Sequence, residues 1–269
     1  MNLFDTHAHY DDKRFAEDRY ELLASLPGQG VKYITNIGCD LETSRNTIEL
    51  CERFPHVFGA VGFHPHEAKS MSDEALMEIE KMLAHDKVKA LGEIGLDYHY
   101  DFSERDVQRE AFAKQLEVAK AHKIPVVIHE REACKDVLDI LRASGVRDGV
   151  VHCFGGSKET ARELLDMGFH ISFTGVITFD NARKALEVVP YIPADRIMVE
   201  TDCPYLTPIP FRGKRNHSGY LRYTVDKMAQ LRGISFDECA QLTFENGVRF
   251  YGIHEESSEP GCSCSPVFA

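Results

Sequence analysis

Eight short apolar runs alternate along this sequence with longer stretches in which apolar residues recur at helical spacing. The runs have the length of β-strands, and several are apolar almost throughout, which is typical of parallel strands covered on both faces. They are Leu3–Thr6, Val31–Ile37, Val57–Gly62, Ala90–Glu93, Pro125–His129, Gly149–His152, His170–Thr174 and Ile197–Thr201. Strict alternation of strand and helix predicts a parallel sheet, and eight strands are the number that closes a (β/α)8 TIM barrel.

The intervening stretches predict helices. The clearest are Ser72–Leu83, Arg105–His122, Ser157–Met167, Tyr220–Arg232 and Ser235–Tyr251. Ser72 precedes two acidic residues, which favours it as an N-cap, and Gly252 is a typical stop signal after the last helix. An open, doubly wound sheet would produce a similar alternation, so it is the alternative to the barrel.

The length of 269 residues fits a single barrel, which typically needs about 250 residues. We expect this domain over residues 1–253. Residues 254–269 hold few large apolar side chains, so we expect a polar tail that is mobile or loosely docked. The tail carries Cys262 and Cys264, but a zinc site would need two further ligands nearby.

The formal net charge of −12 argues against a protein that coats nucleic acid through a broad basic surface. It is compatible with an enzyme that grips a few phosphates while divalent cations supply positive charge. The first residues do not resemble a signal peptide, and no apolar run reaches the roughly 18 residues of a membrane span. The eight cysteines are scattered, and we interpret them as reduced thiols. We therefore expect a cytoplasmic monomer with no obligate protein partner and no membrane association.

Residue types that bind divalent metals fall at the carboxyl ends of five predicted strands. They are His7, His9, Glu93, His129, His152 and Asp202. In a parallel barrel all these ends meet at one rim, where barrel enzymes keep their active sites. A single histidine after a strand is more often a core or capping residue than a ligand, but six such residues at corresponding positions argue for a common site.

Four imidazoles and two carboxylates are too many for one tetrahedral ion. They suit two cations roughly 3.5–4 Å apart that share a bridging carboxylate. Zn²⁺ and Mn²⁺ fit this mixed donor set best, and Mg²⁺ is a further candidate. His7 and His9 can reach the same ion because alternate residues of a strand point the same way.

Other residues near this rim are candidates for substrate contact. His64 follows the third predicted strand and faces the same rim, where we expect it to contact substrate or water. Arg212, Lys214 and Arg215 follow the eighth strand and predict an anion site, to which Arg131 can add charge; the alternative is a solvated basic loop. The aromatic residues near the rim can stack on bases, although core positions are the commoner outcome. They are Phe63, Tyr98, Tyr100, Phe154 and Tyr205.

Several ordered motifs resemble the TatD family of metal-dependent deoxyribonucleases, within the amidohydrolase-like superfamily of barrels. They are Phe4-Asp5-Thr6-His7-Ala8-His9, Gly62-Phe63-His64-Pro65-His66, Gly92-Glu93-Ile94-Gly95-Leu96-Asp97-Tyr98, Val127-Ile128-His129, His152-Cys153-Phe154-Gly155-Gly156 and Glu200-Thr201-Asp202-Cys203-Pro204-Tyr205-Leu206. The resemblance spans about residues 3–252. It implies two divalent metals, one held by His7, His9 and Asp202 and the other by His129 and His152, with Glu93 bridging.

The sequence departs from the usual motifs of the family at two rim loops. His217-Ser218-Gly219 stands where an acidic residue and a proline are common, and Glu130 stands where a small polar residue is common. These departures concern substrate preference more than the metal site.

The resemblance implies hydrolysis of DNA phosphodiesters in the 3′–5′ direction. We expect Asp202 to act as general base towards a metal-activated water, Glu93 to bridge the ions, and His64 with Arg212 or Lys214 to offset charge on the phosphate. Single-stranded DNA is favoured, because a recessed site in an acidic protein is poorly suited to a duplex. The alternatives are a hydrolase of esters or amides on the same metals, such as aminoacyl-tRNA deacylation, and a non-catalytic metal-binding scaffold.

Overall fold

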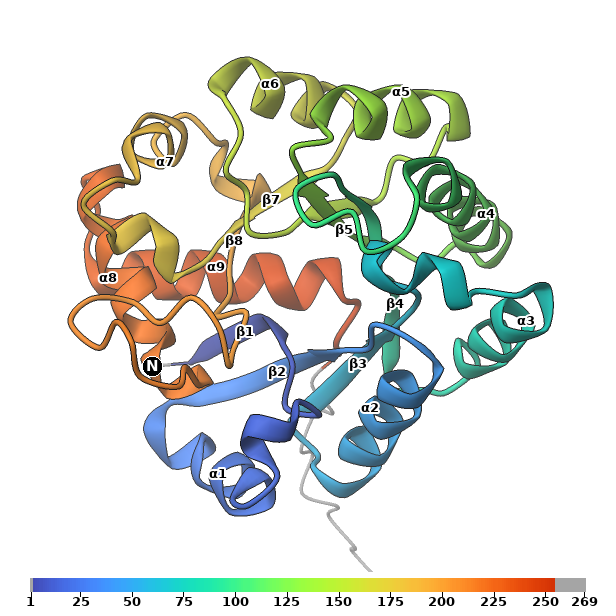
Figure 1. Ribbon diagram of the computed structural model, residues 1–269. Coiled ribbons are helices and arrows are strands. Elements are labelled where there is room, and N and C mark those ends of the chain that lie inside the picture. Colours follow the sequence, from blue (N-terminus) through green and yellow to red (C-terminus); the bar gives the residue numbers. More distant parts are fainter. Residues whose placement is uncertain (1, 255–269) are drawn as a thin grey trace, which may run out of the picture.

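The computed structural model describes residues 2–254, in which eight parallel strands form one sheet in sequence order and curl into a barrel (Figure 1). The strands are β1 (Leu3–Ala8), β2 (Val31–Ile37), β3 (Val57–Val61), β4 (Val88–Asp97), β5 (Val126–Arg131), β6 (Gly149–Val151), β7 (His170–Phe173) and β8 (Ile197–Val199). The first and last strands meet: Thr6 Oγ1 donates to the Val199 carbonyl at 3.0 Å, and a parallel bridge joins Ala8 to Cys203. The chain is therefore a (β/α)8 barrel, and the doubly wound alternative is wrong because its strand order would reverse.

Helices surround the barrel as an outer ring (Figure 1). They are α1 (Arg19–Ser25), α2 (Leu41–Arg53), α3 (Asp73–Met82), α4 (Arg105–His122), α5 (Cys134–Ser144), α6 (Lys158–Asp166), α7 (Arg183–Val188) and α8 (Leu221–Arg232), followed by α9 (Phe236–Phe250). The five predicted helices agree with these bounds to within one residue at each end. Ser72 is the N-cap of α3, since its side chain accepts a hydrogen bond from the Ala75 amide.

Three strands extend beyond their predicted ends, β1 by two residues to Ala8 and β4 and β5 as follows. We placed Glu93 and His129 at strand ends, but β4 continues to Asp97 and β5 to Arg131. The extension exists because Gly95 pairs with His129 and Asp97 with Arg131 in the ladder between these strands. Gly95 has φ +141°, and a Cβ there would lie 2.0 Å from the His129 carbonyl oxygen, so only glycine permits this approach. Glu93 therefore lies in the middle of a strand.

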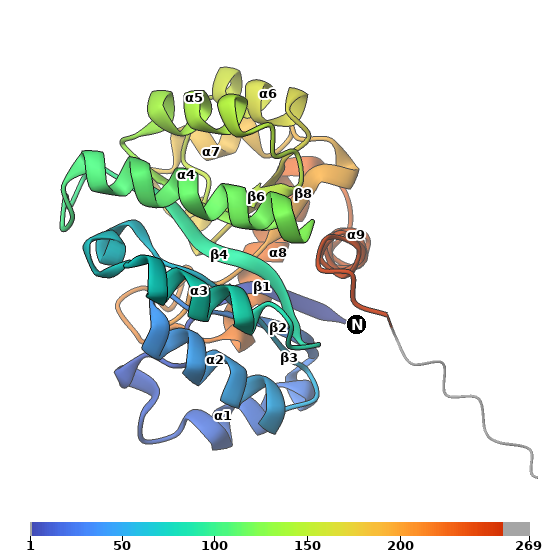
Figure 2. The same ribbon diagram turned by 90° about the vertical axis from the view of Figure 1, so that its right-hand side faces the viewer.

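Helix α9 covers the amino ends of the strands, as Figure 2 shows with the helix viewed end-on beside the barrel. Phe244, Phe250 and Tyr251 pack against an interior layer to which seven of the eight strands contribute one residue each. That layer consists of Phe4, Ile37, Ala60, Ala90, Val127, Val150 and Met198. Asn246 Nδ2 donates to the carbonyls of Ala194 and Ile197, both at 2.7 Å. Because α9 closes this end, the strand-to-helix loops of the opposite end are left to build a site.

Within residues 2–254, no helix has both the length and the apolar composition needed to cross a bilayer. The six cysteines in this part of the chain are free thiols, as predicted. The predicted tail, apart from His254, lies outside the described residues, and so do Cys262 and Cys264.

Candidate metal centre

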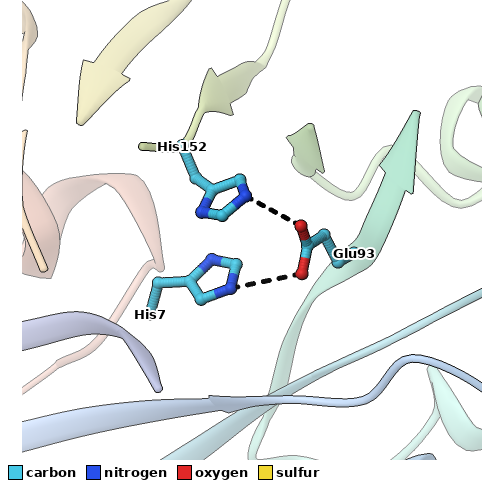
Figure 3. Close-up of side chains that lie close together, drawn as sticks. All are labelled: His7, Glu93 and His152. Atoms are coloured by element: carbon cyan, nitrogen blue, oxygen red, sulfur yellow. Dashed lines mark ion pairs between the residues drawn. The ribbon is translucent and has the colours of Figure 1, made fainter. Parts of the chain in front are cut away.

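Glu93 is the centre of the candidate site. Figure 3 shows its carboxylate facing two imidazoles, that of His7 from β1 and that of His152 just after β6. Glu93 is buried, with a side chain that is 3% exposed. Its two oxygens face different rings, with His7 Nε2 3.3 Å from Oε2 and His152 Nε2 2.7 Å from Oε1. The imidazoles themselves stack, with centroids 4.0 Å apart and planes 11° apart.

A first group of donors surrounds Glu93 Oε2. His9 Nε2 lies 3.7 Å from this oxygen and 3.1 Å from His7 Nε2. Asp202 Oδ1 lies 3.4 Å from His9 Nε2 and 3.7 Å from His7 Nε2. The H-x-H spacing at the end of β1 thus directs both imidazoles to one point, and the loop after β8 brings Asp202 to the same point.

A second group surrounds Glu93 Oε1. His129 Nδ1 lies 2.8 Å from this oxygen and 3.3 Å from His152 Nε2. His64 caps the 3₁₀ turn η3 (Pro65–Ser70) after β3, and its Nε2 lies 3.5 Å from the same oxygen. The other five predicted ligand residues and His64 therefore cluster around the carboxylate of Glu93.

The donor set fits divalent cations. Imidazole nitrogens face each other across 3.1 Å between His7 and His9 and across 3.3 Å between His129 and His152, where at most one proton can lie. The Ile37 carbonyl, 2.9 Å from His9 Nδ1, accepts the proton of that nitrogen, which leaves a lone pair on Nε2. Buried nitrogens and carboxylate oxygens of this kind suit Zn²⁺ and similar first-row ions, and Glu93 can lie between two of them.

Both carboxylates of this cluster remain ionised. Burial alone would raise the pKa of Glu93, but the imidazoles around it, with His152 foremost, hold that pKa well below its usual value. Burial would likewise raise the pKa of Asp202, but the nearby imidazoles of His9, His7 and His152 lower it. Ionised oxygens are the form that binds a cation.

Two further carboxylates lie beside the site histidines, and we did not predict them. Asp97 Oδ2 lies 3.1 Å from His129 Nε2 and 3.0 Å from His66 Nε2. Glu200 Oε1 lies 3.3 Å from His152 Nδ1. Asp97 stands four residues after Glu93 and shares its face of β4, so a correct strand end would have revealed it.

The four predicted cationic contacts have different environments. Arg131, Arg212 and Lys214 are exposed. Arg212 lies over the Phe179 ring at 4.1 Å, and Lys214 lies over the Phe211 ring at 5.3 Å. Arg215 is already engaged, because its guanidinium donates to both carboxylate oxygens of Asp18, at 2.8 and 2.5 Å. That ion pair ties the loop after β8 to the start of α1.

A cluster of imidazoles and carboxylates at the rim of a (β/α)8 barrel defines a metal-dependent hydrolase. The family model described as TatD-related DNase matches residues 4–252. This chain belongs to that family, as the sequence motifs predict.

Known relatives agree over the full barrel. The chain is 43% identical over 254 residues to an uncharacterised metal-dependent hydrolase of Bacillus subtilis, YabD, covering 94% of this chain and 100% of that protein. It is 31% identical to a Salmonella typhimurium protein named 3′-5′ ssDNA/RNA exonuclease TatD, covering 93% and 99% of the two chains. The crystal structure of the TatD homologue YjjV from Escherichia coli matches with a TM-score of 0.89 at 29% identity, over 94% of this chain and 98% of that one.

Proposed function

We propose that this protein is a two-metal nuclease that removes nucleotides from the 3′ end of single-stranded DNA. The observation that carries the proposal is the position of Glu93 between two separate groups of nitrogen and oxygen donors. The Salmonella relative named as a 3′-5′ exonuclease supports the substrate class and the direction.

In this proposal His7, His9 and Asp202 would hold one cation, and His129 and His152 would hold the other. Glu93, which lies between the two groups, would be shared by both cations. Zn²⁺ or Mn²⁺ suits these donors best, and Mg²⁺ is a further candidate. Such cations lower the pKa of a bound water and offset the charge of a phosphodiester.

His64 is assigned to the substrate rather than to a metal. The backbone amide of His66 donates to His64 Nδ1 at 3.1 Å, so in the neutral ring the proton is on Nε2. Burial holds the pKa of His64 well below its usual value, which keeps the ring neutral. His64 Nε2–H therefore faces the cluster as a hydrogen-bond donor and can stabilise a phosphate oxygen.

Asp202 is the proposed general base. Its side chain is only 15% exposed and its lowered pKa keeps it ionised, so a carboxylate oxygen at the rim is available to accept the proton of the attacking water. Arg212 and Lys214, on the loop that follows, are proposed to bind the phosphates of the strand, together with Arg131 at the end of β5. Arg215 serves to hold that loop through Asp18.

The test is an assay of the metal-reconstituted protein on oligonucleotides labelled at either end. Single-stranded DNA, duplex DNA, RNA, a carboxylic ester and an aminoacyl-tRNA are compared at equal concentration. We expect mononucleotides to be released from the 3′ end, fastest from single-stranded DNA. Hydrolysis of only the ester or the aminoacyl bond would overturn the nuclease assignment, and binding of metal without any hydrolysis would favour a scaffold.

A further inference from the structure

Two large aromatic side chains are exposed on the loop between β4 and α4. Tyr100 is 48% exposed and Phe102 57% exposed, although tyrosine and phenylalanine are usually more buried. Their rings are stacked, with centroids 5.3 Å apart and planes 22° apart. The loop starts directly after Asp97, so the pair stands at the same rim as the candidate metal centre.

A single imidazole separates this pair from the metal centre. The His66 ring meets Tyr100 and Phe102 edge-on, with centroids 5.5 and 4.7 Å away. On its other side His66 lies 4.3 Å from His64 and, through Asp97, is linked to His129. A nucleotide whose phosphate lies at His64 therefore has its base within reach of the two rings.

The two rings are held in place by their surroundings. The Tyr100 amide donates to Asp97 Oδ1 at 2.9 Å, and Lys69 Nζ donates to the Phe102 carbonyl at 3.1 Å. The Arg131 guanidinium lies over the Tyr100 ring at 4.8 Å. A preorganised surface loses little entropy when a ligand stacks on it.

Another exposed aromatic residue at this rim is less available. Tyr205 is 46% exposed, but the Arg14 guanidinium covers its ring at 4.0 Å and its hydroxyl donates to Asp12 at 3.2 Å. The Arg131 guanidinium also lies over the Tyr100 ring, so the more accessible ring surface of the pair is that of Phe102, which is 57% exposed.

We propose that Tyr100 and Phe102 form a stacking platform for the nucleobase adjoining the bond that is cut, and that Arg131 contacts the neighbouring phosphate. The inference rests on the proposed nuclease function and adds the residues that select a strand with unpaired bases. Stacking on a ring tolerates every base, because each has a π face, but it requires a base that is not paired in a duplex.

The test combines a double variant, Tyr100→Ala with Phe102→Ala, and two strands of equal length. One strand is intact and the other lacks bases at its last three 3′ positions. For the intact strand we expect the double variant to raise KM about tenfold and to leave kcat within threefold, as the loss of one stacked base implies. For the abasic strand we expect the wild-type KM to be higher than for the intact strand. The KM of the double variant for the abasic strand should lie within threefold of that wild-type value.

Three controls separate stacking from damage to the loop. The pair Tyr100→Phe with Phe102→Tyr keeps both rings and should restore a KM within threefold of wild type. Tyr20→Ala removes a similarly exposed ring that has Arg53 over it at 4.0 Å but lies on α1 against Phe54, and it should not change KM. A 3′-terminal 2-aminopurine should lose fluorescence on binding to the wild type and not to the double variant.

An unchanged KM in the double variant, or an equal rise on both strands, would overturn the platform while leaving the nuclease function intact. If the wild type hydrolyses neither strand, the proposed function fails. The 2-aminopurine measurement then tests the platform by binding alone. Equal quenching by the wild type and the double variant would overturn the platform.

Discussion

At the scale of single residues, the neighbours of each site histidine determine which of its nitrogens is free. Ile37 accepts the proton of His9 Nδ1, and Asp97 accepts that of His129 Nε2. These contacts leave His9 Nε2 and His129 Nδ1 as lone pairs that face the cluster. His64 has the opposite arrangement, because its Nδ1 accepts from a backbone amide. In the proposed centre the same residue type would thus supply both metal donors and a proton donor.

Asp97→Asn tests the orientation of His129. An amide carries no charge and cannot accept strongly from both His129 and His66, so we expect metal affinity to fall about 10- to 100-fold. Titration calorimetry of the metal-free protein measures this directly, and excess metal should restore most of the activity. Asp136→Asn, which alters a carboxylate that accepts from Tyr98, is the matched control. Equal affinities in the Asp97 variant and the wild type would show that Asp97 does not position the ligand.

Asp202→Asn tests the general base. The amide cannot accept a proton, so we expect kcat to fall at least about 100-fold while the protein folds and retains some metal. Circular dichroism and metal analysis check the fold and the metal content alongside the kinetics. Activity within threefold of wild type would mean that another group accepts the proton.

At the scale of elements, helix α9 depends on close contact with β1. A Cβ on Gly247 would lie 2.6 Å from Phe4 Cδ1 and 3.1 Å from Thr6 Cγ2. Phe4 cannot yield easily, because the rings of Tyr33 and Tyr251 pack against it at 5.7 and 5.6 Å. The helix covers the amino end of the barrel only because this position lacks a side chain.

Gly247→Ala should therefore destabilise the protein by about 1–2 kcal/mol, since overpacking outweighs the roughly 1 kcal/mol of helix propensity that alanine gains. Urea unfolding monitored by circular dichroism measures the change. Gly28→Ala is the control, because a Cβ there meets nothing within 4 Å. A Gly247→Ala protein as stable as the wild type would show that α9 shifts freely.

His170, at the start of β7, makes stability depend on pH. Burial and the nearby charges of Arg196 and Arg249 lower its pKa to about 4, against about 6.5 in the unfolded chain. Between these two pKa values the unfolded state binds more protons than the folded state. The contribution of His170 to the free energy of unfolding is therefore complete above about pH 6.5 and is lost as pH falls towards 4.

This loss is on the order of 3 kcal/mol at full protonation. His170→Gln should flatten the fall in urea midpoint between pH 6.5 and pH 4, relative to both the wild type and the exposed-site control His122→Gln. If the urea midpoint falls with pH in parallel for all three proteins, other groups cause the loss of stability in acid.

At the scale of the whole molecule, the barrel has the means to fold without bound metal. The main hydrophobic cluster draws buried residues from strands and outer helices, and a second fills the barrel above α9. The candidate ligands occupy strands β1, β4 and β5 and the loops after β6 and β8, which the ladder aligns independently of any ion.

A chelator should therefore abolish hydrolysis while the far-ultraviolet circular dichroism at 25 °C stays within a few per cent. Bound metal stabilises only the folded state, by about 3–4 kcal/mol at concentrations 100 to 1,000 times Kd, which corresponds to a fall in Tm of about 5–15 °C on removal. Collapse of the helical signal at 25 °C would show that the metals are required for folding.

Much of the architecture was predictable because it depends on local patterns. Helix α4 was predicted with its observed bounds, and Ser72 was predicted as the cap of α3, because apolar spacing and capping are properties of neighbouring residues. The ends of β4 and β5 were predicted wrongly. Their last residues are polar, and they stay in the sheet because each strand pairs with the other, a long-range interaction that no local pattern contains.

The sequence by itself determined the fold class and the residues that gather at the rim, because parallel strands of a barrel bring their carboxyl ends together whatever the loops do. Only the tertiary structure decided which of those residues lie together and which contacts surround them. It placed Glu93 between two donor groups, engaged Arg215 with Asp18 and added Asp97 behind His129. These outcomes depend on distances of a few ångströms between side chains from different strands and loops, which are determined by how the strands stagger and pack and not by the order of the residues.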